Sequence, residues 1–100
     1  MVFLFGTLRH RPLLEAVLGR PVAGADLAPA TLADHDIVWA RGQTFPLLHA
    51  RPGARAEGLL LSGLDTSDMA RLAFYEGVFG YDLAPVEVAC AGAARPALAW

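Results

Sequence analysis

The feature that most constrains the fold of this chain is that its apolar residues occur in runs too short for a helix. The first run, Val2–Phe5, is closed by Gly6, and the clearest later strand is predicted at Ala56–Leu61, which ends in three leucines. Apolar runs of about four to eight residues between turn residues are typical of buried strands. The same pattern predicts further short strands at Ala30–Leu32, Ile37–Ala40, Pro46–Leu48, Val86–Ala89 and Ala97–Trp100.

A first helix is predicted shortly after the opening strand. Pro12 suits its first turn, and Gly19 followed by Pro21 ends it. Its apolar stripe consists of Leu13, Leu14, Val17 and Leu18. The glycine, alanine and proline content of Pro21–Pro29 then favours a loop, and Arg51–Ala54 has the composition of a turn.

A second helix is predicted to begin after a capping residue, which is Asp65, Thr66 or Ser67. Asp68 would then lie near the positive end of the helix dipole. We expect the helix to run to about Tyr75 or Glu76. Gly77 would follow it in the left-handed position that ends many helices.

Short strands outnumber helices in this pattern and are joined by tight turns. A doubly wound parallel sheet is therefore unlikely, because its strands alternate with helices. The predicted fold class is α+β: a small, mostly antiparallel β-barrel with two short flanking helices. At 100 residues the chain has the usual size of one domain, so we assign residues 1–100 to a single domain. This domain either ends with the strand at Trp100 or is truncated at its C-terminus.

Charge and cysteine content exclude several functional classes. The net charge is −2 and the chain contains no lysine, so no basic stripe is available for nucleic acid. Cys90 is the single cysteine, and the three histidines are scattered, so neither an internal disulfide nor a metal site is expected. No apolar stretch approaches the roughly 18 residues of a membrane span. We therefore expect a cytoplasmic protein that binds neither nucleic acid nor membrane.

Glu76 is the residue that fits the helical pattern least well. It shares one face of the second helix with Met69, Leu72 and Ala73, at the i, i+3, i+4 and i+7 positions. Burial and the negative end of the helix dipole both disfavour its charged form, which would raise its pKa above the usual value of about 4.3. The alternative is that the last turn frays and that Glu76 points to solvent.

The second candidate feature is Gly6-Thr7-Leu8, which connects the first strand to the first helix. A glycine at this position allows consecutive backbone N–H groups to point at an anion such as a carboxylate. The alternative is a plain turn. Arg9 and Arg11 could assist an anionic ligand, although arginines near a helix start are usually solvated.

Nucleophilic catalysis is not indicated. Ser62, Ser67 and Thr7 have no histidine in an evident triad. Cys90 lies in an apolar strand, where a thiolate is disfavoured.

Several of these segments together resemble one known family. They are Val2-Phe3-Leu4-Phe5-Gly6-Thr7-Leu8, Phe45-Pro46, Glu57-Gly58, and Phe74-Tyr75-Glu76-Gly77 followed by Gly80-Tyr81. Their order and spacing resemble the gamma-glutamylcyclotransferase-like family over nearly the whole chain.

The resemblance implies a small β-barrel enzyme that needs no cofactor or metal. Members release 5-oxoproline from gamma-glutamyl amines or peptides through attack of the α-amine on the γ-carbonyl. The resemblance implies that Gly6, Thr7 and Leu8 bind the substrate through backbone N–H groups, next to Phe5 and Tyr81. It also implies that Glu76 is the general base and then the general acid.

This chain departs from the family pattern at two positions within the site. Phe5 stands where relatives commonly have tyrosine, so a hydroxyl is missing. Asp82 and Leu83 stand where relatives often have arginine.

The chain is also similar to the N-terminal module that precedes Nudix hydrolase domains in some bacterial proteins of the ADP-ribose pyrophosphatase type. No Nudix motif occurs in these 100 residues. The alternative hypothesis is therefore a non-catalytic ligand-binding or accessory domain, with a fused hydrolase domain beyond Trp100. A third reading, a structural interaction domain, would rest on the 55% hydrophobic content.

Overall fold

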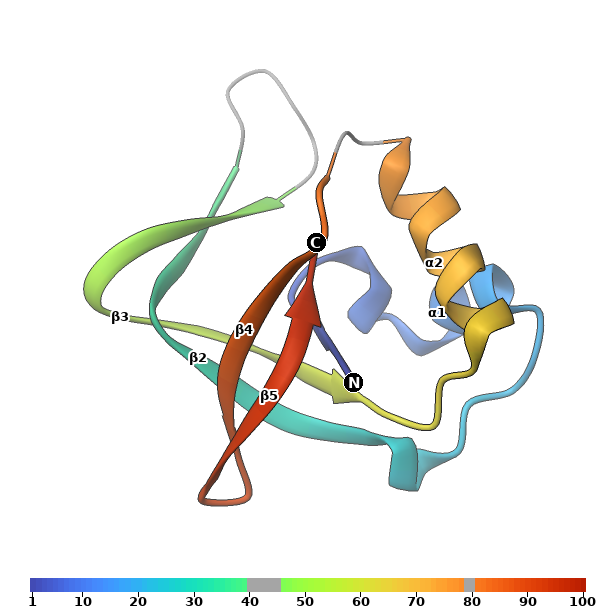
Figure 1. The fold of residues 1–100 in the computed structure, drawn as a ribbon, viewed down its shortest axis with the longest axis horizontal. Coiled ribbons are helices and arrows are strands. Elements are labelled where there is room, and N and C mark those ends of the chain that lie inside the picture. Colours follow the sequence, from blue (N-terminus) through green and yellow to red (C-terminus); the bar gives the residue numbers. More distant parts are fainter. Residues whose placement is uncertain (40–45, 79–80) are drawn as a thin grey trace.

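The computed structural model describes residues 1–39, 46–78 and 81–100. Within them the chain forms five strands, two α-helices and two single-turn 3-10 helices (Figure 1). In chain order these are β1 (Val2–Leu4), η1 (Thr7–Arg9), α1 (Arg11–Leu18), η2 (Gly24–Asp26), β2 (Leu27–Trp39), β3 (Pro46–Leu61), α2 (Thr66–Gly77), β4 (Ala84–Cys90) and β5 (Ala93–Ala99).

The five strands close into a barrel in the order β1-β3-β2-β4-β5, with β5 returning to β1. Among the strand pairs formed by the described residues, only β1–β5 is parallel. The two α-helices pack together outside the barrel, on the right in Figure 1. The predicted α+β fold, a small and mostly antiparallel barrel with two flanking helices, is confirmed. No helix in the described ranges is long and apolar enough to cross a membrane.

The β2–β3 hairpin is longer than the sequence pattern predicted. Residues 27–29 belong to β2 rather than to a loop, and Arg51–Ala54 lies inside β3 rather than forming a turn between strands. The pairing moves from Ala33 opposite Arg55 to His35 opposite Ala50, so residues 51–54 face Asp34. The turn-forming residues therefore make a bulge that bends the hairpin.

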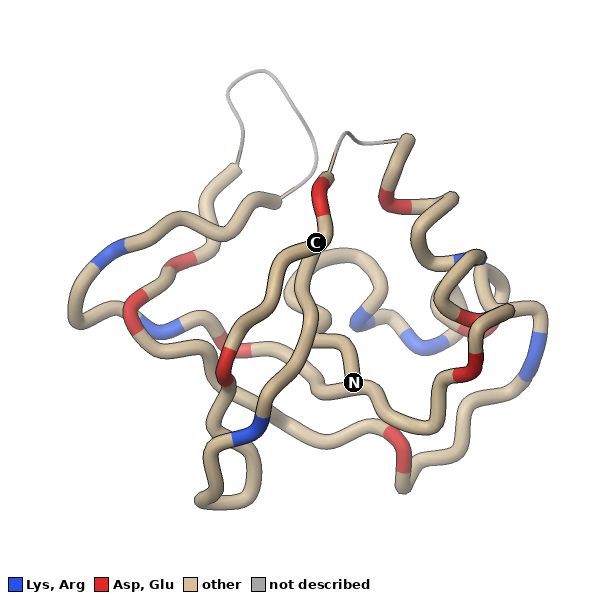
Figure 2. The backbone as a smooth tube through the Cα atoms, viewed as in Figure 1, with Lys and Arg blue, Asp and Glu red and all other residues tan. Residues whose placement is uncertain are grey.

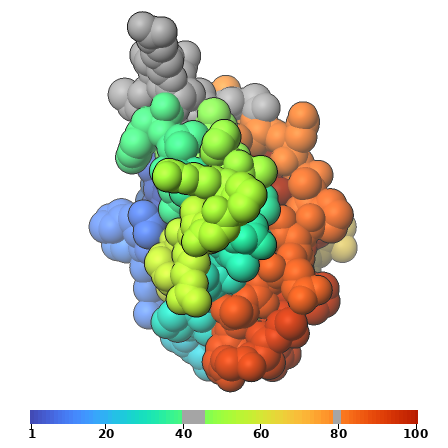
Figure 3. Space-filling view, turned by 90° about the vertical axis from the view of Figure 1, so that its left-hand side faces the viewer, coloured from blue at the N-terminus to red at the C-terminus, as the bar shows by residue number. Residues whose placement is uncertain are grey.

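Two residues with positive φ hold this bulge. Asp34 has φ 60° and Gly53 has φ 81°, and the Asp34 carboxylate accepts a hydrogen bond of 3.0 Å from the Gly53 amide. The bent hairpin forms much of the face in Figure 3, where β2 and β3 lie beside β4. The predicted strand Ile37–Ala40 is part of β2, although Ala40 itself lies outside the described residues.

The remaining short elements follow the sequence more closely. Helix α1 begins at Arg11 with Pro12 in its first turn and ends before Gly19, which has φ 71°. Strands β4 and β5 are joined at Ala91 and Gly92, both with positive φ, which is the geometry of a tight hairpin turn.

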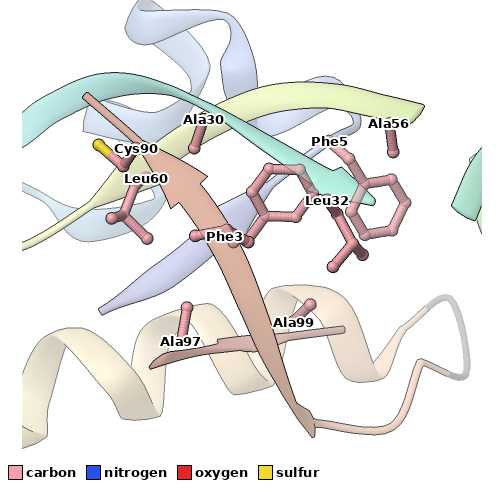
Figure 4. Close-up of a cluster of buried hydrophobic side chains, with 10 residues drawn as sticks. Phe3, Phe5, Ala30, Leu32, Ala56, Leu60, Cys90, Ala97 and Ala99 are labelled. Atoms are coloured by element: carbon pink, nitrogen blue, oxygen red, sulfur yellow. The ribbon is translucent and has the colours of Figure 1, made fainter. Parts of the chain in front are cut away.

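Strand β1 separates two cores, which explains why the run of apolar residues Val2–Phe5 is continuous. Phe3 points into the barrel, where its ring lies among Leu32, Leu60 and Ala97 (Figure 4). Val2 and Leu4 point the other way, toward α1 and α2. Because successive side chains of a strand face opposite sides, β1 is buried on both.

Gly58 allows β1 to approach β3 closely. A Cβ atom at this position would lie 2.3 Å from the Leu4 carbonyl oxygen and 2.8 Å from the Phe3 ring. No other residue fits such a space. The glycine of the Glu57-Gly58 segment is therefore required by the packing of β1.

Helix α2 is rotated slightly from the predicted orientation. Leu72 is fully buried and Met69 packs beside it, but Ala73 is exposed. Asp68 and Tyr75 lie on the covered side instead.

The prediction for Gly77 was also wrong. It is the last helical residue, and Val78 after it stays in the right-handed region, so no left-handed cap forms.

The N-terminal end of α2 is held by a network of charged groups. Asp65 is the cap, and its carboxylate and that of Asp68 each accept a hydrogen bond from the other residue's amide. Asp68 is only 4% exposed and accepts hydrogen bonds from Arg20 at 2.7 and 3.1 Å. Elsewhere the charges of the described residues are spread over the molecule, without a basic side (Figure 2).

Candidate active site

A cavity of about 170 Å³ opens at the end of the barrel, between the loop after β1 and the last turn of α2. It brings together residues that are far apart in the sequence. Its lining residues are Phe3, Leu4, Phe5, Gly6, Thr7, Leu8, Pro46, Tyr75, Glu76, Tyr81 and Trp100.

Glu76 lies half-buried in the wall of this cavity. Burial raises the pKa of its carboxyl group to about 7, because removing a carboxylate from water disfavours its charged form. The carboxyl group therefore changes charge near neutral pH. In this structure the last turn of α2 does not fray, and Glu76 is not turned out to solvent.

The loop Gly6-Thr7-Leu8 forms the opposite wall. It enters the short helix η1, in which the amides of Arg9 and His10 bond to the carbonyls of Gly6 and Thr7 at 3.2 and 3.0 Å. The first amides of a helical turn have no carbonyl partner within that turn. Thr7 and Leu8 supply such amides beside the cavity.

The two arginines near this loop have other contacts. Arg9 donates from Nε to the Gly6 carbonyl at 3.3 Å, so its guanidinium lies along the loop. Arg11 donates to the Val22 carbonyl and pairs with Glu15 at 3.7 Å. Neither side chain lines the cavity. Arg11 therefore does not supply the positive charge for an anionic ligand that the sequence suggested.

The two walls are joined by a hydrogen bond between hydroxyl groups. Thr7 Oγ1 and the phenolic oxygen of Tyr75 are 3.1 Å apart. Tyr75 is the residue before Glu76, so the bond connects the loop directly to the turn that carries the carboxyl group. The sequence indicated Tyr75 only as a residue near the helix end and as part of the Phe74-Tyr75-Glu76-Gly77 segment.

Phe5 and Tyr81 form the aromatic part of the cavity. The Phe5 ring is 6% exposed and meets Tyr81 edge to face with centroids 6.5 Å apart. The Tyr81 hydroxyl donates to the Pro46 carbonyl. Burial raises the pKa of Tyr81, and the nearby Glu76 carboxylate and Tyr75 raise it further. Tyr81 thus places a hydroxyl near Glu76.

Sequence reasoning missed several residues of the cavity. Trp100 was interpreted only as a strand end, and Pro46 only as part of a strand and of the Phe45-Pro46 segment that resembles the family, without a role in the site. Phe3 and Leu4 were assigned to the first strand without a role in a site. Their one available signal was their position next to motif residues, since neither carries a reactive group.

Other residues named from the sequence lie elsewhere. Asp82 is exposed and does not line the cavity. Phe45 and Gly80 fall outside the described residues. Across residues 1–39, 46–78 and 81–100, no group of three histidine, cysteine or acidic side chains is arranged to hold a metal ion.

Two solved structures are similar to this chain. The solution structure of At3g28950.1 from Arabidopsis thaliana has a TM-score of 0.82 and 19% sequence identity, covering 98% of this chain and 58% of that one. The solution structure of At5g39720.1 from the same plant has a TM-score of 0.82 and 18% identity, covering 98% of this chain and 64% of that one. At these identities the likeness concerns the fold.

This chain spans less than two thirds of the length of either structural relative. No curated protein matches it. The family of gamma-glutamyl cyclotransferases, AIG2-like, matches residues 2–100, which include every lining residue of the cavity. The chain belongs to the AIG2-like gamma-glutamyl cyclotransferase family.

Proposed function

We propose that this domain converts a gamma-glutamyl amine or peptide to 5-oxoproline and the free amine, with Glu76 as general base and general acid. The observation that carries this proposal is that Glu76 and the three residues of the Gly6-Thr7-Leu8 loop line one cavity. The pKa of about 7 for Glu76 supports it, because a group that exchanges protons at the working pH is the most effective catalyst.

In the proposed reaction the substrate supplies its own nucleophile. Glu76 as a carboxylate takes a proton from the α-ammonium group, and the freed nitrogen attacks the γ-carbonyl carbon. A ring C–N bond forms, and the bond from that carbon to the leaving nitrogen breaks. Glu76 passes this proton to the leaving nitrogen, takes a second proton from the ring nitrogen as the tetrahedral intermediate collapses, and gives it to the released amine. Both protons lost by the α-nitrogen are thus gained by the leaving nitrogen, and Glu76 ends as a carboxylate. The reaction consumes no water and involves no oxidation.

The opposite wall would stabilise negative charge. Backbone amides of Gly6, Thr7 and Leu8 are suited to bind the substrate carboxylate or the oxygen of the tetrahedral intermediate. Phe5 would contribute apolar contact and Tyr81 its hydroxyl-bearing ring. The cavity of about 170 Å³ is smaller than the roughly 300–1,000 Å³ of sites for drug-sized ligands, which suits a single glutamyl group.

The test is an assay for 5-oxoproline with a panel of gamma-glutamyl amines and dipeptides. We expect Glu76→Gln to lower kcat/KM by roughly 10²–10⁴-fold, the usual contribution of general acid–base catalysis. Glu87→Gln is the matched control, because Glu87 is an exposed acid on β4 outside the cavity. Unchanged activity in Glu76→Gln would rule out the assigned role.

A second candidate is a non-catalytic ligand-binding or accessory domain of a longer protein, such as a Nudix hydrolase of the ADP-ribose pyrophosphatase type. Two observations support this candidate. Both structural relatives are longer than this chain, and position 5 is a phenylalanine, which lacks the hydroxyl of the family's usual tyrosine. Reading the open reading frame past Trp100 tests the fusion. A wild-type protein that binds 5-oxoproline but turns over no member of the panel would favour binding over catalysis.

We also propose a cytoplasmic location. Cys90 is the chain's single cysteine and is a buried free thiol, which suits a reducing compartment. Fractionation of cells that express the tagged protein would test this, and recovery outside the cytosol would contradict it.

A further inference from the structure

We propose that the hydrogen bond between Thr7 and Tyr75 is a clasp that sets the position of the Glu76 turn relative to the Gly6-Thr7-Leu8 amides. Tyr75 would then be a positioning residue for the reaction, although it carries none of the chemistry. This inference rests on the proposed function, because its purpose is to hold the two walls of the same cavity at a fixed separation.

The geometry of the clasp supports this role. Its two oxygens are 3.1 Å apart and come from residues 68 positions apart in the chain. Both residues line the cavity. Thr7 is the first residue of η1, and Tyr75 immediately precedes Glu76. A shift of either hydroxyl therefore moves an adjoining functional group.

Apart from the Tyr75 side chain, which also packs against the core shared by β1 and the helices, few side chains in the last turn of α2 are buried in the described structure. Leu72 is buried one turn earlier, but Phe74, Gly77 and Val78 are all exposed. The Tyr81 amide reaches the Glu76 carbonyl only at 3.4 Å. Gly77 also adds backbone freedom. Side-chain contacts such as the clasp therefore have a large influence on where Glu76 lies.

The opposite end of α2 does not need such a clasp. Asp65 caps it, and Asp68 is bound to Arg20. The start of the helix is thus fixed by these bonds, and the position of its end would depend on the clasp. Catalysis is sensitive to this adjustment, because a misplacement of about 1 Å can cost on the order of 100-fold in rate.

The first experiment compares Tyr75→Phe, Thr7→Val and the double variant in the 5-oxoproline assay. Each single variant should lower kcat/KM about 10-fold, mainly through kcat, because backbone amides rather than the hydroxyls would bind the substrate. The double variant should be no worse than the poorer single one. Thr7→Ser, which keeps the hydroxyl, should recover most of the kcat that Thr7→Val loses.

The matched control is Thr31→Val. Thr31 also donates its hydroxyl to another side chain, Glu57 at 2.9 Å, but lies outside the cavity. We expect it to leave kcat unchanged. Single variants with wild-type kcat, or losses that multiply in the double variant, would overturn the clasp.

A second measurement does not depend on turnover. Amide hydrogen exchange should become faster in Tyr75→Phe at Arg9 and His10, whose amides bond to the Gly6 and Thr7 carbonyls, and at residues 75–77 together, while residues 68–70 keep their protection. If the wild type forms no 5-oxoproline but these two segments loosen together, the clasp stands and the proposed reaction fails. If the wild type is active and neither exchange nor kcat changes in Tyr75→Phe, the reaction stands and the clasp fails.

Discussion

The two ends of helix α2 each carry a carboxyl group that is at least partly removed from solvent, but the pKa of one is lowered and the pKa of the other is raised. Asp68 in the first turn is almost fully buried and is held as an anion. Glu76 in the last turn is half-buried, yet burial raises its pKa to about 7. Burial alone therefore does not decide the charge of an acid on this helix.

The difference is explained by the groups that surround each acid. Hydrogen bonds from Arg20 lower the pKa of Asp68 by more than burial raises it, and the Asp65 amide adds to this effect. The start of a helix also favours negative charge. Within the described part of the chain no cation pairs with the Glu76 carboxyl group, which lies at the unfavourable end of the helix. One acid serves stability, and the other is available for proton transfer.

The largest effect that tests this comparison is the pH dependence of activity. If Glu76 must be ionised to act as a base, kcat/KM should fall about 10-fold per unit as pH decreases below the pKa near 7. Asp68→Asn should keep this limb in the pH–rate profile, because Asp68 is already ionised throughout that range. A wild-type profile that is flat between pH 5 and 8 would contradict the role of Glu76.

Stability should respond to Asp68 with the next largest effect. Asp68→Asn removes the charge that pairs with Arg20, and we expect a loss of roughly 1.5–3 kcal/mol in the free energy of unfolding at neutral pH. The pKa of Asp68 is lowered in the folded state. Its contribution is therefore present above the unfolded pKa of about 4 and is lost as pH falls through the folded value.

Urea denaturation at pH 7 and at pH 3 would measure this effect. Asp65→Asn is a suitable control, because asparagine caps a helix about as well as aspartate. A loss in Asp68→Asn that is equal at both pH values would show that the ion pair is not its cause.

Glu76→Gln should change stability in the opposite direction. Because its pKa is raised in the folded state, the folded wild type loses stability as pH rises from about 4.5 to about 7. The variant avoids this loss. Each pKa unit corresponds to about 1.4 kcal/mol, and solvent access to the cavity reduces the gain to roughly 1–2 kcal/mol above pH 7. The difference in the free energy of unfolding between Glu76→Gln and the wild type should vanish near pH 4. Urea denaturation that gives equal stability for the two proteins at pH 8 would contradict this prediction.

The sequence was sufficient for the fold because the informative residues act locally. Val2–Phe5 with Gly6, Pro12 with Gly19, and the acids before α2 each favour one local structure. The errors occurred where tertiary pairing overrides a local preference. Arg51–Ala54 has the composition of a turn, but the pairing of Ala50 and Arg55 on either side of it with β2 incorporates it into a strand as a bulge. Gly77 matched a helix end, yet no left-handed residue forms there.

The site could be predicted only in part, for a related reason. Glu76 was identifiable because it disrupts an apolar stripe, and Gly6 because it follows a strand. Pro46 and Trp100 carry no such signal, since only closure of the barrel brings them to the cavity. The Thr7–Tyr75 bond spans 68 residues, so no local pattern predicts it.

The smallest expected effect is the coupling between the two acids. They are eight residues apart on one helix, which corresponds to about 12 Å at a rise of 1.5 Å per residue. At that distance, and with no shared partner, the two substitutions should add within about 0.5 kcal/mol. Denaturation of the wild type, Asp68→Asn, Glu76→Gln and the double variant at pH 8 would measure the coupling. A larger value would mean that the Arg20 pair also influences Glu76, so that the two ends of α2 could no longer be treated as independent.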